Sequence, residues 1–203
     1  MRHVFSSALV LSMCGVCAAG PSVTYISSGD LIGSLSYDGT AGAGNAIGDN
    51  SYETIRWTPA TGVVRLGLAS FPVINRAAGT PDISFNGNRV SASILSSDYQ
   101  LTQGLWDLNN GWTDLMPPSP EGGALVDDGY GSAWGLSGNG MHVSGFYWST
   151  SFRAQASIGT PGAGVVALGQ IEGRSARANA TSYDGSVCGG WEEAEWGSWM
   201  PRA

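Results

Sequence analysis

The carboxylates are the residues of this chain whose type and grouping best suit catalysis. Two aspartates are adjacent in a Gly- and Pro-rich stretch and three glutamates are grouped near the C-terminus: Asp127, Asp128, Glu192, Glu193 and Glu195. Hydrolysis of a glycosidic bond requires only two carboxyl groups, about 5–10 Å apart across a concave site. A solvated acidic edge explains the same grouping. A glycoside hydrolase that uses Glu193, Glu195, Asp127 and Asp128 is therefore the alternative hypothesis, behind a non-enzymatic protein.

The first 19 residues predict a secretory signal. Arg2 gives a basic start, residues 4–17 form a short apolar run, and Ala18-Ala19-Gly20 is a small-residue exit. The apolar run is too short to span a bilayer core of about 30 Å, which requires roughly 20 residues. We predict cleavage after Ala19, secretion from the cell, and a single mature domain of residues 20–203.

Removal of the signal leaves one cysteine, Cys188, and one histidine, His142. A single cysteine excludes an internal disulfide and a CxxC metal site. Cys188 is predicted to lie on a strand as a small apolar side chain, and His142 follows a predicted turn. No serine lies in a G-x-S-x-G nucleophile motif. We therefore predict no metal, no cofactor and no nucleophilic triad.

The charge of the chain excludes two classes of partner. Nine basic residues, all of them Arg, stand against sixteen acidic residues, for a net charge of −7. Such a chain does not attract phosphate backbones and has no basic amphipathic helix for an anionic membrane surface. We predict a monomer that binds a protein or glycan outside the cell, without nucleic acid and without membrane insertion after signal cleavage.

A repeated unit organises the chain. Residues 58–67 recur at residues 160–169 with seven identities, at an offset of 102 residues. The tetrapeptide S-x-[DN]-G occurs four times, and its glycines are 48, 53 and 45 residues apart, so 102 residues correspond to two units. Its last two residues are Asp38 and Gly39, Asn86 and Gly87, Asn139 and Gly140, and Asp184 and Gly185. These pairs fit the two central positions of a tight hairpin turn, where a positive φ is required.

The unit size predicts an all-β repeat protein. Four short strands with their loops make about 40–50 residues, the size of one propeller blade. The last unit lacks the strand that reads G-V-V-x-L-G in the first and third units and G-W-T-D-L in the second, whereas residues 23–26 form an extra strand before the first turn. We predict that this strand completes the last unit and closes a small four-bladed β-propeller, which removes a free sheet edge. The alternative is an open β-repeat array.

The tryptophans divide into two groups by their place in the unit. Trp57, Trp106 and Trp199 recur at one position of the repeat, so we predict that they are core aromatics between units. Other aromatics lie outside this register, beside the glutamates or in an aromatic run: Trp191, Trp196, Tyr147 and Trp148. Exposed aromatic rings suit contact with a sugar ring or an apolar partner surface. We therefore take these four as candidate binding residues.

The repeat resembles that of a known family, the extracellular HAF-repeat proteins of bacteria. Residues 176–189 (A-R-A-N-A-T-S-Y-D-G-S-V-C-G) are similar to the first part of the family pattern, and Arg56-Trp57-Thr58 and residues 62–67 to the rest. The resemblance covers nearly the whole mature chain, although the His-Ala-Phe triplet is absent from every copy. It implies a secreted β-repeat protein and assigns no activity to particular residues.

Overall fold

A computed structural model describes residue 26 and residues 30–48, 51–67, 80–95, 101–115, 131–148, 153–169, 171, 173–195 and 198–202. The predicted signal and the candidate site residues Asp127, Asp128 and Trp196 lie outside this part of the chain, as do residues 23–25 of the predicted closing strand. Glu195 and Trp199 are described for their backbone alone. In the described ranges no helix is long and apolar enough to cross a membrane.

The described strands form four antiparallel sheets, each with its strands in chain order. Sheet 1 consists of β1 (Asp30–Leu35), β2 (Gly42–Gly48), β3 (Ser51–Thr58) and β4 (Gly62–Arg65). Sheet 2 consists of β5 (Asp82–Ile83), β6 (Arg89–Leu95), β7 (Leu101–Asp107) and β8 (Gly111–Asp114). Sheet 3 consists of β9 (Gly131–Leu136), β10 (Val143–Trp148), β11 (Ala154–Thr160) and β12 (Gly164–Ala167). Sheet 4 consists of β13 (Ala176–Thr181), β14 (Cys188–Glu195) and β15 (Ser198–Arg202). The predicted all-β repeat fold is confirmed, with one sheet for each predicted unit.

The third strand of each sheet shows where sheet 4 differs. β3 and β7 pair with the whole second strand, so that Trp57 lies opposite Gly42 and Trp106 opposite Val90. In sheet 4, β15 pairs only with the far end of β14, where Ser198 lies opposite Glu195 and Arg202 opposite Glu192. Trp199 is therefore not at the position that Trp57 and Trp106 occupy, because the residue opposite that position in sheet 4 would be Cys188.

The hairpin between the first and second strands is built in the same way in all four sheets. In sheet 1, Ser36 Oγ donates a hydrogen bond to Asp38 Oδ1 (2.9 Å), the Thr40 N–H donates to the same oxygen (3.0 Å), and the Ala41 N–H donates to Ser36 Oγ (2.9 Å). The same three bonds occur around Asn86, Asn139 and Asp184.

The turn glycine follows the turn instead of occupying its centre. The Gly39 N–H donates to the Ser36 carbonyl (2.9 Å), so Tyr37 and Asp38 are the central residues, not Asp38 and Gly39 as the sequence pattern predicts. The four glycines have φ values of 71°, 71°, 73° and 78°. A left-handed residue after a regular turn returns the chain to the second strand, and glycine takes that conformation without strain.

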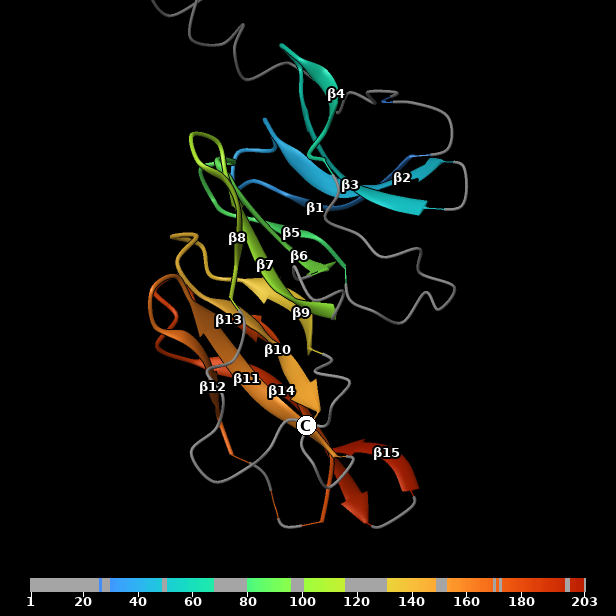
Figure 1. Cartoon of the computed structure of the whole chain (residues 1–203), viewed down its shortest axis with the longest axis vertical. Coiled ribbons are helices and arrows are strands. Elements are labelled where there is room, and N and C mark those ends of the chain that lie inside the picture. The colour runs from blue at the N-terminus through green and yellow to red at the C-terminus, as the bar shows by residue number, and fades with distance from the viewer. Residues whose placement is uncertain are drawn as a thin grey trace, which may run out of the picture.

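The four sheets pack in a row. One buried apolar cluster joins sheets 1 and 2 and includes Leu66, Ile83 and Val90, with Trp106 and Trp112 partly buried against it. A second cluster joins sheets 2 and 3 and consists of Leu105, Leu115, Ala133, Leu136, Val143 and Val165. Figure 1 shows sheet 1 at one end of the long axis and β15 at the other.

The turns repeat a contact from one sheet to the next. The residue two places after each turn glycine packs on the glycine of the following turn; the pairs are Ala41 with Gly87, Arg89 with Gly140, and His142 with Gly185. At the two ends of the row this contact has no counterpart among the described residues. A Cβ on Gly39 would have no atom within 4 Å, and Val187 is 65% exposed.

Candidate binding surfaces

The tips of the four hairpins meet in one surface, which we name the turn-tip surface and define by Tyr37, Phe85, Gly138 and Tyr183. Backbone hydrogen bonds join the tips: the Tyr37 N–H donates to the Phe85 carbonyl (3.1 Å), and the Phe85 N–H to the Gly138 carbonyl (2.9 Å). The Asn139 N–H donates to the Tyr183 carbonyl (2.8 Å). Side chains from three sheets are thereby held together by the backbone of all four.

Three aromatic rings cover this surface. The Phe85 ring centroid lies 5.3 Å from that of Tyr37 and 5.4 Å from that of Tyr183, with the rings tilted. Gly138 forms the floor, since a Cβ there would lie 2.5 Å from Tyr183 Cδ2 and 3.1 Å from Phe85 Cδ1. The side chains remain exposed: 82% for Tyr37, 46% for Phe85 and 59% for Tyr183. Contiguous exposed apolar surface with polar neighbours is characteristic of binding sites.

Two carboxylates flank the rings and stay ionised. Hydrogen bonds from the side chain and backbone of Ser186, and from Ser182, lower the pKa of Asp184 to about 2. The backbone N–H of Thr40 is the largest of the interactions that lower the pKa of Asp38. In the turns of sheets 2 and 3 the equivalent residues are uncharged amides, Asn86 and Asn139. The turn-tip surface thus combines aromatic rings with a polar, net anionic rim.

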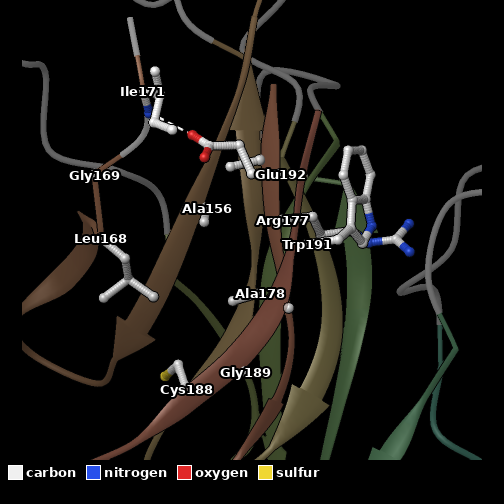
Figure 2. Close-up of a pocket in the computed structure, with 12 residues that line it drawn as sticks. Ala156, Leu168, Gly169, Ile171, Arg177, Ala178, Cys188, Gly189, Trp191 and Glu192 are labelled. Carbon is white, nitrogen blue, oxygen red and sulfur yellow. Dashed lines mark hydrogen bonds between the residues drawn. The ribbon is translucent and has the colours of Figure 1, made fainter. Parts of the chain in front are cut away.

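An open groove of about 510 Å³ lies between sheets 3 and 4. Sheet 3 contributes Ala156 and the segment with Leu168 and Ile171, and β13 and β14 contribute mainly small residues, among them Ala178, Cys188 and Gly189 (Figure 2). Burial raises the pKa of the Cys188 thiol, so the thiol stays mostly protonated at neutral pH. The groove is mainly apolar, and its lining suits the binding of an apolar group.

The one carboxylate of the groove is already engaged. Glu192 Oε1 accepts a hydrogen bond from the Ile171 N–H, as Figure 2 shows. Arg177, on β13, has its guanidinium 3.4 Å from the ring centroid of Trp134 and 5.3 Å from that of Trp191. Burial lowers the pKa of Arg177, yet an arginine remains charged in proteins. This cation therefore serves the packing of sheet 4 on sheet 3.

Glu193 belongs to a structural network. It is 6% exposed; its Oε2 accepts a hydrogen bond from the Ser175 N–H (3.1 Å) and lies 3.9 Å from Arg153 Nη1. The Glu193 N–H also donates to the Ser175 carbonyl (2.9 Å). A general acid or base must reach a substrate, and this buried carboxylate joins sheet 4 to the segment before β13. The hydrolase hypothesis, which names Glu193, Glu195, Asp127 and Asp128, stays a prediction.

The described aromatic candidates are only partly exposed; Tyr147 and Trp148 lie on β10 of sheet 3, and Trp191 lies on β14 of sheet 4. Tyr147 packs against the core of sheets 2 and 3 and donates a hydrogen bond to Gln155 Oε1 (3.2 Å). Trp148 contacts Phe146 edge to face, with centroids 5.8 Å apart. Trp191 lies near Arg177. The aromatic residues of the turn-tip surface were missed, although the sequence carried a signal: the second residue of S-x-[DN]-G is aromatic in three of four copies.

Comparison with known proteins supports no assignment to a family. No family model and no curated protein matches the chain significantly. Among solved structures, TolB from Acinetobacter baumannii is similar over 87% of this chain and 45% of its own, with 13% identity and a TM-score of 0.49. A protein assigned as TolB from Agrobacterium tumefaciens is similar over 75% of this chain and 54% of its own, with 14% identity and a TM-score of 0.49. The chain thus spans about half the length of these two proteins.

Proposed function

We propose that the protein is an exported, non-enzymatic β-repeat module that binds a protein or glycan through the turn-tip surface. The observation that carries this proposal is the cluster of three exposed rings from three different sheets. The exposed part of each ring gains nothing from the fold, whereas it gains apolar contact when a partner or a sugar ring covers it. The pKa values of both flanking carboxylates, Asp38 and Asp184, are lowered, so neither is protonated to act as a general acid at neutral pH, which favours binding over catalysis.

The charge of the surface limits the class of partner. Asp38 and Asp184 keep the rim anionic at physiological pH, and the chain carries a net charge of −7. Nucleic acids and anionic membranes would be repelled. A neutral glycan or a neutral to basic protein surface suits this site.

The family and the closure of the fold are part of the same proposal. We infer from the repeat motifs that the chain is a divergent HAF-repeat protein that is secreted after loss of residues 1–19. For the fold, the proposal keeps the two forms predicted from the sequence, namely a propeller that residues 23–26 of the same chain complete and an open array of sheets in a row. Gly39 and Val187 are the two surfaces that closure would bring together, because their counterparts are in contact at every other turn.

A binding screen of the mature protein tests the function. The protein is applied to an array of neutral oligosaccharides and, in parallel, to extracellular proteins from the same culture. We expect a ligand whose affinity falls at least tenfold, about 1.4 kcal/mol, in Phe85→Ala. The matched control is Leu108→Ala, an apolar residue of similar exposure (51%) at the β7–β8 hairpin. Equal affinity of both variants would place binding elsewhere.

A further inference from the structure

Among the described residues, one part of sheet 4 next to the groove has no partner strand along its edge. Residues 188–191 of β14 pair with β13 on one side. On the other side β15 pairs only from Glu192 onward, whereas β3 pairs with all of β2, β7 with all of β6 and β11 with all of β10. The backbone donors and acceptors of an open edge are a template for one more strand.

The groove is where that strand's side chains would lie. Leu66, Leu115 and Leu168 are equivalent residues of the repeat; the first two are 8% and 2% exposed, but Leu168 is 46% exposed. Trp106 and Trp112, from the third and fourth strands of sheet 2, pack with the cluster that covers Leu66. No described residue of sheet 4 covers Leu168 as Trp106 and Trp112 cover Leu66, and the open groove lies beside Leu168 instead.

The two ends of the row are complementary to each other. Val187 occupies the position of Ala41, Arg89 and His142, each of which covers the glycine of the next turn. Gly39 is the turn glycine that no described side chain covers. Val187 of sheet 4 could therefore pack on a Gly39 of sheet 1, as the equivalent residues of successive sheets pack on each other within the row.

We propose that a second copy of this chain occupies the groove and the open edge of sheet 4. Residues 23–26 of that copy pair antiparallel with residues 188–191, which places Ile26 opposite Cys188, where Trp57 and Trp106 stand in sheets 1 and 2. Val187 then packs on Gly39 of the second copy. The segment matches the edge in length, four residues to four, and it is apolar and β-branched in part.

The short linker between residues 23–26 and β1 indicates that these residues reach sheet 4 of a second copy, not sheet 4 of their own chain. Only residues 27–29 separate Ile26 from β1, and the four steps from Ile26 to Asp30 span at most about 14 Å. Sheets 2 and 3 lie between sheet 1 and the groove in the same chain (Figure 1), and face-to-face packing adds about 10 Å for each sheet. The strand therefore reaches the groove of a neighbouring copy. The proposal is an alternative to the monomer predicted from the sequence, and it does not depend on the ligand of the turn-tip surface.

Cys188 permits a direct test, because it is the one cysteine of the predicted mature chain. The variant Ile26→Cys is oxidised under mild conditions and examined on non-reducing gels and by peptide mass. We expect a disulfide between the thiol introduced at position 26 of one chain and Cys188 of another, which requires Cα atoms about 4.4–6.8 Å apart. Tyr25→Cys is the matched control, since its side chain would point to the opposite face of the strand.

Sedimentation of the protein without introduced cysteines provides a second measurement. We expect a dimer or larger assembly for the mature chain, and monomers of unchanged circular dichroism for Val187→Arg and for deletion of residues 20–26. The proposal is overturned if the mature chain is monomeric at every concentration. It is also overturned if the disulfide from position 26 to Cys188 forms within a single chain, as a propeller closed on itself requires.

Discussion

One glycine in each of three sheets has a role that a single substitution can isolate. The first strand of sheets 1, 3 and 4 contains a β-bulge, and opposite each bulge stands a glycine: Gly44, Gly145 and Gly190. A Cβ on any of them would overlap a backbone carbonyl of the bulged strand. For Gly190 the overlapped oxygen belongs to Arg177, and the same Cβ would lie 2.8 Å from the Ala178 Cα. We predict that Gly190→Ala destabilises the protein.

The magnitude follows from three contributions. Forcing a methyl group against backbone costs about 1–3 kcal/mol. Separating the strands enough to admit it weakens one or two ladder hydrogen bonds, at about 0.5–1.5 kcal/mol each. The lower entropy of the unfolded chain returns about 0.4–1 kcal/mol. The expected loss is about 2–4 kcal/mol, or roughly 5–15 °C in Tm for a domain of this size.

The neighbouring residue supplies the control. Gly189 lies on the same strand, and a Cβ there would meet no atom within 4 Å. Gly189→Ala should therefore leave Tm unchanged or raise it slightly, because only the unfolded-state entropy changes. Thermal and urea unfolding of the two variants, followed by circular dichroism, makes the comparison. Equal stability of the two variants would refute the assigned role of the bulge.

Three further predictions concern charge, buried polarity and export. The folded pKa of Asp184 is lowered from 3.8 to about 2, so its stabilising effect is complete above pH 4 and disappears as the pH falls toward 2. Between pH 5 and pH 2 the free energy of unfolding should therefore fall less in Asp184→Asn than in the unmodified protein. Glu193→Ala leaves the Ser175 N–H without its side-chain acceptor and removes one ionic contact of Arg153. We expect the free energy of unfolding in urea to fall by about 1–3 kcal/mol, and an unchanged midpoint would contradict the network. Intact-mass analysis of the exported protein should give a chain that begins at Gly20, whereas a retained Met1 would exclude the predicted cleavage.

The sequence predicted the repeat well because the turn motif is local. Ser36, Asp38 and Gly39 form the hairpin with their own side chains and backbone, so the same residues in the same order give the same turn in each copy. The centre of the turn was misplaced by one residue, since an Asx-Gly pair serves two hairpin types equally well. The local pattern identifies a hairpin, and the number of residues between the strand ends decides its type.

The register of the last strand could not be predicted in this way. Trp199 has the sequence surroundings of Trp57, yet β15 pairs with the far end of β14. Strand pairing depends on contacts between residues that a sequence motif does not relate. The burial of Glu193 likewise follows from Ser175 and Arg153, which are distant in the sequence. The positions of Trp199 and Glu193 thus depend on tertiary contacts that no sequence motif encodes.

The aromatic residues of the turn-tip surface are not required by the hairpin turns that carry them. The four turns have the same hydrogen bonds whether their second residue is Tyr, Phe or Gly, so the fold does not require an aromatic side chain there. Gly138 demonstrates this, since its turn closes with no side chain at all. Three large rings nevertheless stand at these positions and remain exposed. Because burial in the fold does not account for them, contact with a partner outside the fold is the explanation that their chemistry supports.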